Sequence, residues 1–229
     1  MQIFLNELIE TFQYTGLLMP ALLKGMAVTV ELFVLTLILS IPLGLPFALG
    51  SSSRLWPVKA LCKVYIWIFR GTPLMLQLFF FYFFLPIAIG VTLDSFPTAV
   101  ITFVLNYAAY FAEIYRAGIE SIDRGQYEAA QSLGLSRYRI MFGIILPQTV
   151  KRVLPPVSNE AITLIKDTAL VSVIGVGELL KAAKGAVNRD VNVTAYAIAA
   201  AIYLIFTFVM TVISQRLEKR FSRHEAREA

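Results

Sequence analysis

The residue pattern with the clearest chemical meaning is Glu128-Ala-Ala-Gln-Ser-Leu-Gly134, which is followed at a fixed spacing by Ile144-Ile-Leu-Pro147. The pattern lies in a basic, polar stretch between long apolar runs. Its residues favour a short helix, and Ala129 and Ala130 present so little side chain that another protein can approach closely. Gly134 can adopt a positive φ and end that helix. We therefore expect this stretch to dock a soluble partner.

Residues suited to catalysis or metal binding are sparse. Cys62 is the only cysteine and His224 the only histidine, so the sequence predicts neither an intrachain disulfide nor a cysteine metal cluster. It also lacks the His-Glu-x-x-His pattern, the nucleophile elbow and the Gly-x-x-x-x-Gly-Lys-Ser/Thr phosphate loop. We expect no catalytic residue, no bound metal or other cofactor and no nucleic-acid partner for this chain.

The composition is that of a membrane protein. Of the 229 residues, 58% are hydrophobic and only 15% are charged, against about 25% charged in soluble domains. About 20 apolar residues are needed to cross the hydrocarbon core of a bilayer. Four runs meet that need, and a fifth is apolar but carries Glu160, Lys166 and Asp167. The predicted spans cover about 25–50, 64–90, 95–118, 153–178 and 192–215.

The distribution of basic residues predicts how the chain is oriented. Segments rich in Lys and Arg stay on the cytoplasmic side. With five spans and the N-terminus outside, 14 of the 20 Lys and Arg residues fall on the inner side and 4 on the outer side. The fourth span is included because this split needs an odd number of crossings. The loop around Lys181 to Asp190 is more basic than an outer loop should be.

The two ends of the chain are predicted to lie outside the spans. Phe4, Leu8 and Phe12 fall on one helical face, which favours an amphipathic helix in the outer interface over residues 1–18. We expect a transmembrane domain over residues 19–215, with an inner loop at 122–147, and a basic cytoplasmic tail over 216–229. The first basic residue is Lys24, so the N-terminus does not resemble a cleavable signal peptide.

Polar residues at membrane depth are the candidates for a translocation path, because such groups are costly there and face a cavity or a partner. Asn106, Tyr110 and Glu113 share one helical face, and Asn159, Thr163 and Asp167 recur every four residues. The residues expected to line a path are Gln77, Asn106, Tyr110, Asn159, Glu160 and Thr163. The alternative is that these side chains only hold helices together through buried hydrogen bonds.

Four charged residues are expected to form ion pairs between helices: Glu113, Arg116, Lys166 and Asp167. Lys166 and Asp167 are adjacent on a helix and cannot face each other. We expect Lys166 to pair with Glu113 or Glu160, and Asp167 to pair with Arg116.

The pattern Glu-Ala-Ala-x3-Gly-x9-Ile-x-Leu-Pro is matched here at every fixed position. It resembles the signature loop of the permease subunits of ATP-binding-cassette (ABC) importers. Four further segments are similar to the polar-amino-acid branch of that family: Phe69-Arg-Gly-Thr-Pro-Leu74, Ala112-Glu-Ile-Tyr-Arg-Ala-Gly118, Leu146-Pro-Gln148 and Lys166-Asp-Thr168.

The resemblance implies an all-α integral membrane protein with the type I importer permease fold, about five transmembrane helices and a short cytoplasmic coupling helix. It implies a bacterial inner-membrane location, an identical or similar second permease, two ATPase subunits that hold ATP and Mg, an external substrate-binding protein and a polar amino acid as cargo. The residues that would couple to the ATPase are Gln126, Glu128, Ala129, Ala130, Leu133 and Gly134.

Two other classes stay open from the sequence. The chain could be a channel or a structural membrane subunit that carries the same loop without coupling to ATP. It could also be an exporter subunit, although exporters generally lack the Glu-Ala-Ala loop. The sequence contains no pattern that separates basic, acidic, amide and cystine cargo.

Overall fold

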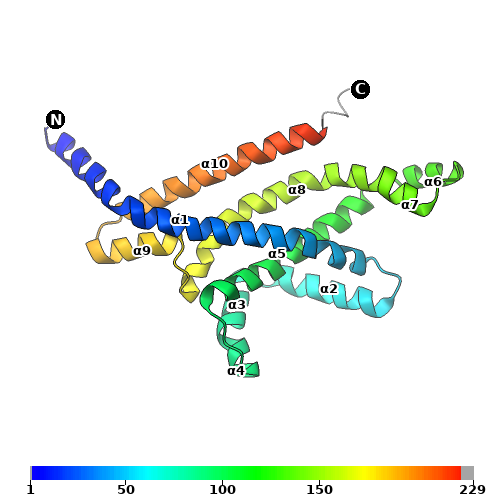
Figure 1. Ribbon diagram of the computed structural model, residues 1–229, viewed down its shortest axis with the longest axis horizontal. Coiled ribbons are helices and arrows are strands. Elements are labelled where there is room, and N and C mark those ends of the chain that lie inside the picture. Colours follow the sequence, from blue (N-terminus) through cyan, green and yellow to red (C-terminus); the bar gives the residue numbers. More distant parts are fainter. Residues whose placement is uncertain (1, 223–229) are drawn as a thin grey trace. The chain divides into compact units, whose positions relative to one another are not determined.

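A computed structural model describes the backbone of residues 2–222 and the side chains of residues 11–221 (Figure 1). Every regular element in this part of the chain is a helix, and no strand occurs between residues 2 and 222. The all-α fold expected from the sequence is therefore confirmed.

The longer helices are α1 (Gln2–Ser51), α2 (Trp56–Gly71), α5 (Ser95–Glu120), α8 (Leu146–Asp167), α9 (Leu179–Asp190) and α10 (Thr194–Ser222). Shorter helices are α3 (Leu74–Phe79), α4 (Leu85–Ile89), α6 (Arg124–Ser132) and α7 (Arg137–Ile140). Two π-helical turns, Phe80–Phe84 and Met141–Ile145, join α3 to α4 and α7 to α8, and a 3₁₀ stretch, Thr168–Ile174, follows α8.

The chain divides into two compact units, and each has its own packing. The first contains the chain up to Leu35, Met75–Thr102 and Thr163–Val209. The second contains Thr36–Leu74, Phe103–Ile162 and the chain from Met210 onward. Helices α1, α5, α8 and α10 contribute residues to both units.

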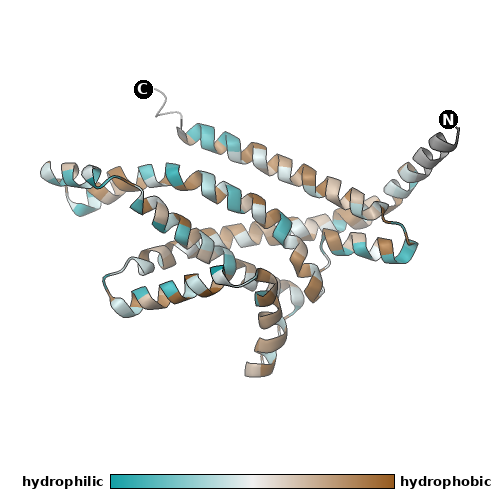
Figure 2. Ribbon diagram, turned by 180° about the vertical axis from the view of Figure 1, so that it is seen from behind, coloured by the Kyte–Doolittle hydropathy of each residue, from teal (hydrophilic) through white to brown (hydrophobic). Residues whose placement is uncertain are grey.

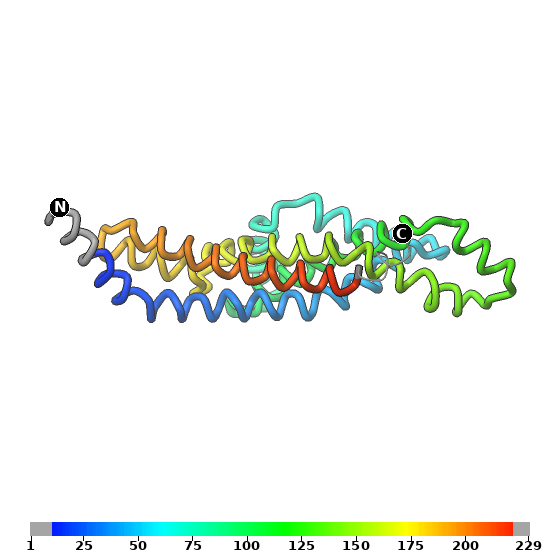
Figure 3. The backbone as a smooth tube through the Cα atoms, turned by 90° about the horizontal axis from the view of Figure 1, so that it is seen from above, coloured from blue at the N-terminus to red at the C-terminus, as the bar shows by residue number. Residues whose placement is uncertain are grey.

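In the first unit, α9 packs against the early turns of α1 and α10 (Figures 1 and 3). The contact is apolar: Leu18 and Leu22 of α1 meet Leu179 and Ala183 of α9, with Ala195 at the start of α10. Small alanine side chains let the helix backbones approach closely, as is common in membrane proteins.

A buried carboxylate fixes the start of α9. Glu178 has no exposed surface, and its two oxygens accept from the backbone N–H groups of Leu180 and Lys181 at 2.7 and 2.6 Å. The hydroxyl of Tyr203 donates to the same carboxylate at 2.7 Å. Glu178 therefore satisfies N–H groups that the first turn of any helix leaves without an intrahelical partner.

The other end of α9 is held by a surface contact. Asp190 accepts from Arg189 and, at 2.9 Å, from the hydroxyl of Tyr14 on α1. The hydrogen bond from Arg189 lowers the pKa of Asp190 to about 2, so this carboxylate stays charged at physiological pH.

In the second unit, the last turns of α1 pack against α5 and α2. Gly44 lies so close to α5 that a Cβ there would be 2.9 Å from the Cβ of Phe111. The hydroxyl of Tyr115 donates to the carbonyl of Ile41 at 3.1 Å, and that of Tyr65 donates to the carbonyl of Leu105 at 2.6 Å. These bonds join three helices that all qualify as parts of membrane spans by length or composition.

Within the described residues, three helices are long and apolar enough to cross a membrane: Thr11–Ser51, Ser95–Glu120 and Thr194–Phe221. A fourth span results if α2 and the helix Leu74–Ile89 count as one broken span. Figure 2 shows α10 as mostly apolar up to its polar C-terminal turns. The fifth predicted span, about 153–178, corresponds to α8 and the 3₁₀ stretch, and its charges keep it outside this hydropathy criterion.

Two predicted boundaries have no break in the structure. Helix α1 is continuous from Gln2 to Ser51, so the predicted interfacial helix (1–18) and first span (25–50) belong to one helix. The side chains of residues 1–10, which would form the amphipathic face, lie outside the described residues. Helix α10 continues to Ser222 into the predicted basic tail, and residues 223–229 of that tail also lie outside the described part.

The close approach of α1 to the start of α9 predicts a sharp effect at Gly25. A Cβ at this position would lie 2.9 Å from the carbonyl oxygen of Glu178 and from the Cα of Leu179, and backbone cannot rotate away. We expect Gly25→Ala to lower the free energy of unfolding by about 1–3 kcal/mol, measured by thermal unfolding in detergent.

Gly16→Ala on the same helix is the matched control, because nothing lies within 4 Å of its added Cβ. Alanine is the better helix former, so this change should be neutral or stabilise by up to about 1 kcal/mol. Equal melting temperatures for the two variants would contradict the close contact.

Candidate functional site

The Glu-Ala-Ala motif forms a helical hairpin made of α6 and α7, between α5 and α8 (Figure 1). Asp123 caps α6, since its carboxylate accepts from the backbone N–H of Gly125 at 2.7 Å. Gly134 ends the turn after α6 with φ of +74°, a conformation that glycine adopts at no steric cost. The side chain of Ser136 then accepts from the backbone N–H of Arg139 and starts α7.

The hairpin has a small apolar core of its own. Ile122, Ala130, Ile140 and Ile145 are buried there, and Ile144 of the motif packs against them. Ala130, which the sequence assigns with Ala129 to the coupling residues, is only 3% exposed. A small residue is needed at that position because α6 lies directly on the isoleucines of the returning chain.

The opposite face of the hairpin is open. Glu128, Ala129 and Gln126 are exposed, and Leu133 is 81% exposed at the turn. Tyr138 stacks near Phe142, with ring centroids 4.4 Å apart, and both rings are exposed. The exposed surface of the hairpin thus contains the small residue Ala129 together with polar side chains, a leucine and an aromatic pair.

The segment Arg70-Gly-Thr-Pro73 breaks the helix after α2, and the structure shows how the break is satisfied. The hydroxyl of Thr72 donates to the carbonyl of Ile68 at 2.8 Å, and the side-chain amide of Asn106 donates to the carbonyl of Phe69 at 3.0 Å. Helix ends leave such carbonyls without an intrahelical partner. Asn106 is only 4% exposed, so this predicted path residue braces α5 against the end of α2.

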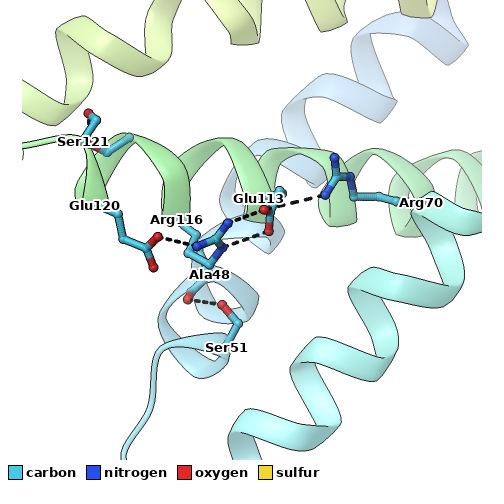
Figure 4. A network of polar contacts seen from close by, with 8 residues as sticks. Ala48, Ser51, Arg70, Glu113, Arg116, Glu120 and Ser121 are labelled. Carbon is cyan, nitrogen blue, oxygen red and sulfur yellow. Dashed lines mark hydrogen bonds and ion pairs between the residues drawn. The ribbon is translucent and has the colours of Figure 1, made fainter.

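A chain of charges runs along α5 to the end of α2 (Figure 4). The Nε of Arg116 donates to Glu113 at 3.0 Å, and its terminal nitrogens pair with Glu113 and Glu120. Arg70 lies 3.8 Å from the second oxygen of Glu113, and its guanidinium lies over the ring of Tyr110, 5.4 Å from the centroid. Glu113 therefore holds two arginines from two helices.

This network differs from the predicted pairing. The ion pairs described for Arg116 lie within its own helix, at the i, i+3 and i, i+4 spacings that favour such contacts. The sequence predicted that Asp167 pairs with Arg116 and that Lys166 pairs with Glu113 or Glu160. Lys166 is exposed on α8, whereas Asp167 is half-buried. The spacing of Glu113, Arg116 and Glu120 in the sequence is sufficient to predict their ion pairs within one helix. The contact of Arg70 with Glu113 depends on the fold, because Arg70 lies on another helix.

The remaining path candidates differ in exposure. Asn159 and Thr163 are exposed one turn apart on α8, and Glu160 beside them is half-buried. Gln77 is buried in α3, and Tyr110 is half-buried under Arg70. Of these path candidates, only Asn159 and Thr163 on α8 are exposed.

The sequence reasoning missed Glu178, the most completely buried acidic group in the described residues. An acidic residue directly after Gly175-Val-Gly177, at the start of a new helical stretch, was the available signal for a capping role.

The comparisons place the chain in a known class. Residues 40–223 match the model of the family described as binding-protein-dependent transport system inner membrane component. The chain belongs to this family of ABC transporter permeases. The embedding in the membrane inferred from composition agrees with that class.

Individual relatives cover nearly the whole chain. An L-cystine transport system permease protein of Bacillus subtilis is 41% identical over 91% of this chain and 89% of its own length. An arginine transport system permease protein of the same organism is 38% identical over 90% and 94%. The crystal structure of an amino acid ABC transporter with histidines superposes with a TM-score of 0.85 at 35% identity, covering 93% of this chain and 97% of that one. The expected type I importer permease fold is confirmed.

The position of Glu113 between two arginines predicts that its loss destabilises the second unit. Its side chain is 28% exposed, so the cost should lie between that of an exposed ion pair and that of a buried one. We expect Glu113→Gln to lower the free energy of unfolding by about 1–2 kcal/mol, measured by thermal unfolding in detergent at low salt.

Glu120 is the other partner of Arg116, and its side chain is 59% exposed. Glu120→Gln removes this ion pair. It should cost less than about 1 kcal/mol. If the two variants lose the same stability, Glu113 is an ordinary surface partner and not the centre of the network.

Proposed function

We propose that this chain is the permease subunit of an ATP-driven importer for a polar amino acid, and that the α6–α7 hairpin transmits the motion of a separate ATPase to the membrane helices. The observation that carries the proposal is the division of the motif: Ala130, Gly134 and Ile144 fold the hairpin, while Glu128 and Ala129 remain exposed. An exposed alanine on a hairpin with its own apolar core suits insertion into a cleft of a partner.

The proposed ATPase contacts are Gln126, Glu128, Ala129, Leu133 and the turn at Gly134. Ala130 acts from inside the hairpin by keeping α6 close to its core. Arg124, Arg137 and Arg139 are exposed around this surface and supply charges that fix the register of docking. Two ATPase subunits would each take one such hairpin from two permease chains, identical or similar, and ATP and Mg would bind to the ATPases.

The cargo is supported by the relatives, whose names assign them to cystine and arginine transport. Both are amino acids with a zwitterionic head. We propose that the exposed polar face of α8, with Asn159 and Thr163 and with Glu160 beside it, lines the translocation path. Gln77 and Tyr110 contribute from the packed interior, and an external binding protein delivers the amino acid.

The orientation follows from the basic residues. The segments 54–63, 116–152 and 216–227 carry 14 of the 20 Lys and Arg residues, so they lie in the cytoplasm, with the N-terminus and α9 outside. This places the hairpin on the side where ATP is available.

Coupling through the hairpin is tested at Leu133. Its side chain is 81% exposed, so Leu133→Ser should leave stability within about 0.5 kcal/mol. In liposomes that contain the chain, its ATPase and its binding protein, we expect ATP hydrolysis stimulated by loaded binding protein to fall about tenfold or more, because an apolar contact central to docking carries more than 1 kcal/mol.

Leu55→Ser is the matched control, since Leu55 is 67% exposed in the loop after α1, outside the hairpin. It should leave stimulated hydrolysis intact. Unchanged hydrolysis in Leu133→Ser, and in a Glu128→Ala variant, would favour a channel or structural subunit that is not coupled to ATP.

The path is tested by a pair of asparagines. Asn159→Ala should raise the apparent KM for transport about tenfold, because a hydrogen bond to cargo contributes about 1–1.5 kcal/mol. Asn106→Ala should instead lower the free energy of unfolding by about 1–3 kcal/mol, because it leaves the Phe69 carbonyl without this donor. Transport assays and thermal unfolding separate the two, and an unchanged KM in Asn159→Ala would remove this face of α8 from the path.

A further inference from the structure

A basic cleft lies between α2 and α5 in the second unit, apart from the hairpin. Its volume is about 630 Å³, and its lining includes Lys63, Trp67 and Arg70 of α2 together with Glu113 and Arg116 of α5. We propose that this cleft binds the phosphate headgroup of an anionic phospholipid from the cytoplasmic leaflet. The location in that leaflet rests on the proposed orientation of the chain.

The first argument is the placement of the α2 residues. Lys63, Trp67 and Arg70 follow the i, i+4, i+7 spacing, so they share one helical face. All three are exposed, whereas Cys62 and Ile66 of the same helix are buried. The two cations are about 10.5 Å apart along the axis, given a rise of 1.5 Å per residue. Their long side chains can converge on one phosphate between them.

The second argument is that these two cations have donors to spare. Arg116 is engaged by Glu113 and Glu120, but Arg70 approaches Glu113 only to 3.8 Å, which is too long for a hydrogen bond. Neither Lys63 nor Arg70 has a hydrogen-bond partner among the described side chains and backbone groups. An arginine guanidinium binds phosphate in a bidentate fashion, and a lysine adds a mobile point charge.

The third argument distinguishes a lipid from free phosphate. Trp67 is 75% exposed in the cleft, and Val64, the exposed apolar residue nearest to it around α2, lies beside this face. Contact with this apolar surface does not stabilise a bound phosphate ion, whereas it stabilises an acyl chain. Tryptophan prefers the headgroup level of a bilayer, and basic pockets between transmembrane helices on the cytoplasmic side bind anionic headgroups.

The experiment uses Trp67 as the reporter. The sequence has two tryptophans, so Trp56→Phe leaves Trp67 alone. The full chain is reconstituted in vesicles of phosphatidylcholine in which either phosphatidylcholine or phosphatidylglycerol carries brominated acyl chains, and quenching of Trp67 fluorescence gives the relative association constant of the two lipids. We expect about a fivefold preference for the anionic lipid for each cation that contacts it.

Lys63→Gln in the same background should reduce the preference about fivefold, while Lys184→Gln on α9, an exposed lysine outside the cleft, should leave it unchanged. Both are surface changes that the fold should tolerate. Equal quenching by both lipids, or a preference that survives Lys63→Gln, would overturn the proposal. A preference abolished by inorganic phosphate at constant ionic strength would assign the cleft to free phosphate instead. The measurement needs neither ATPase nor binding protein, so it stands or falls independently of transport.

Discussion

A backbone group freed by a helix break inside a membrane must find a partner within the protein, because hydrocarbon offers none. Two breaks in this chain are met by dedicated side chains. After α2, Thr72 and Asn106 donate to the carbonyls of Ile68 and Phe69. Before α9, Glu178 accepts from two N–H groups of the new helix. At these two breaks, polar side chains act as partners of the backbone.

The brace at the end of α2 has a consequence for the charges. Asn106 holds Phe69, and the next residue along the chain is Arg70, whose guanidinium is thereby kept over Tyr110 and near Glu113. Glu113 in turn orients Arg116 along α5. Only the approach of Arg70 to this network is linked to the neutral hydrogen bond at Phe69, because the pairs of Arg116 with Glu113 and Glu120 lie within α5.

The sequence predicted what local spacing and hydropathy determine. The position of the hairpin, the positive φ of Gly134 and the helical nature of the chain follow from neighbouring residues, and the structure confirms them. The burial of Ala130 and the role of Asn106 depend on what packs against them from distant segments. The need for glycine at position 25 has the same origin, since the backbone of Glu178 and Leu179 lies against it.

Two structural requirements determine which residues occur in the motif. One is internal: a residue no larger than alanine at position 130, a glycine at 134 for its positive φ and an isoleucine at 144 to close the apolar core. The other is external: exposed Glu128 and Ala129 on the open face. Because consecutive residues of one helix serve both demands, the core sets the rotation of α6 and therefore which side chains a partner meets. A hairpin with its own core can then move as one piece, which is what the proposed coupling to an ATPase requires.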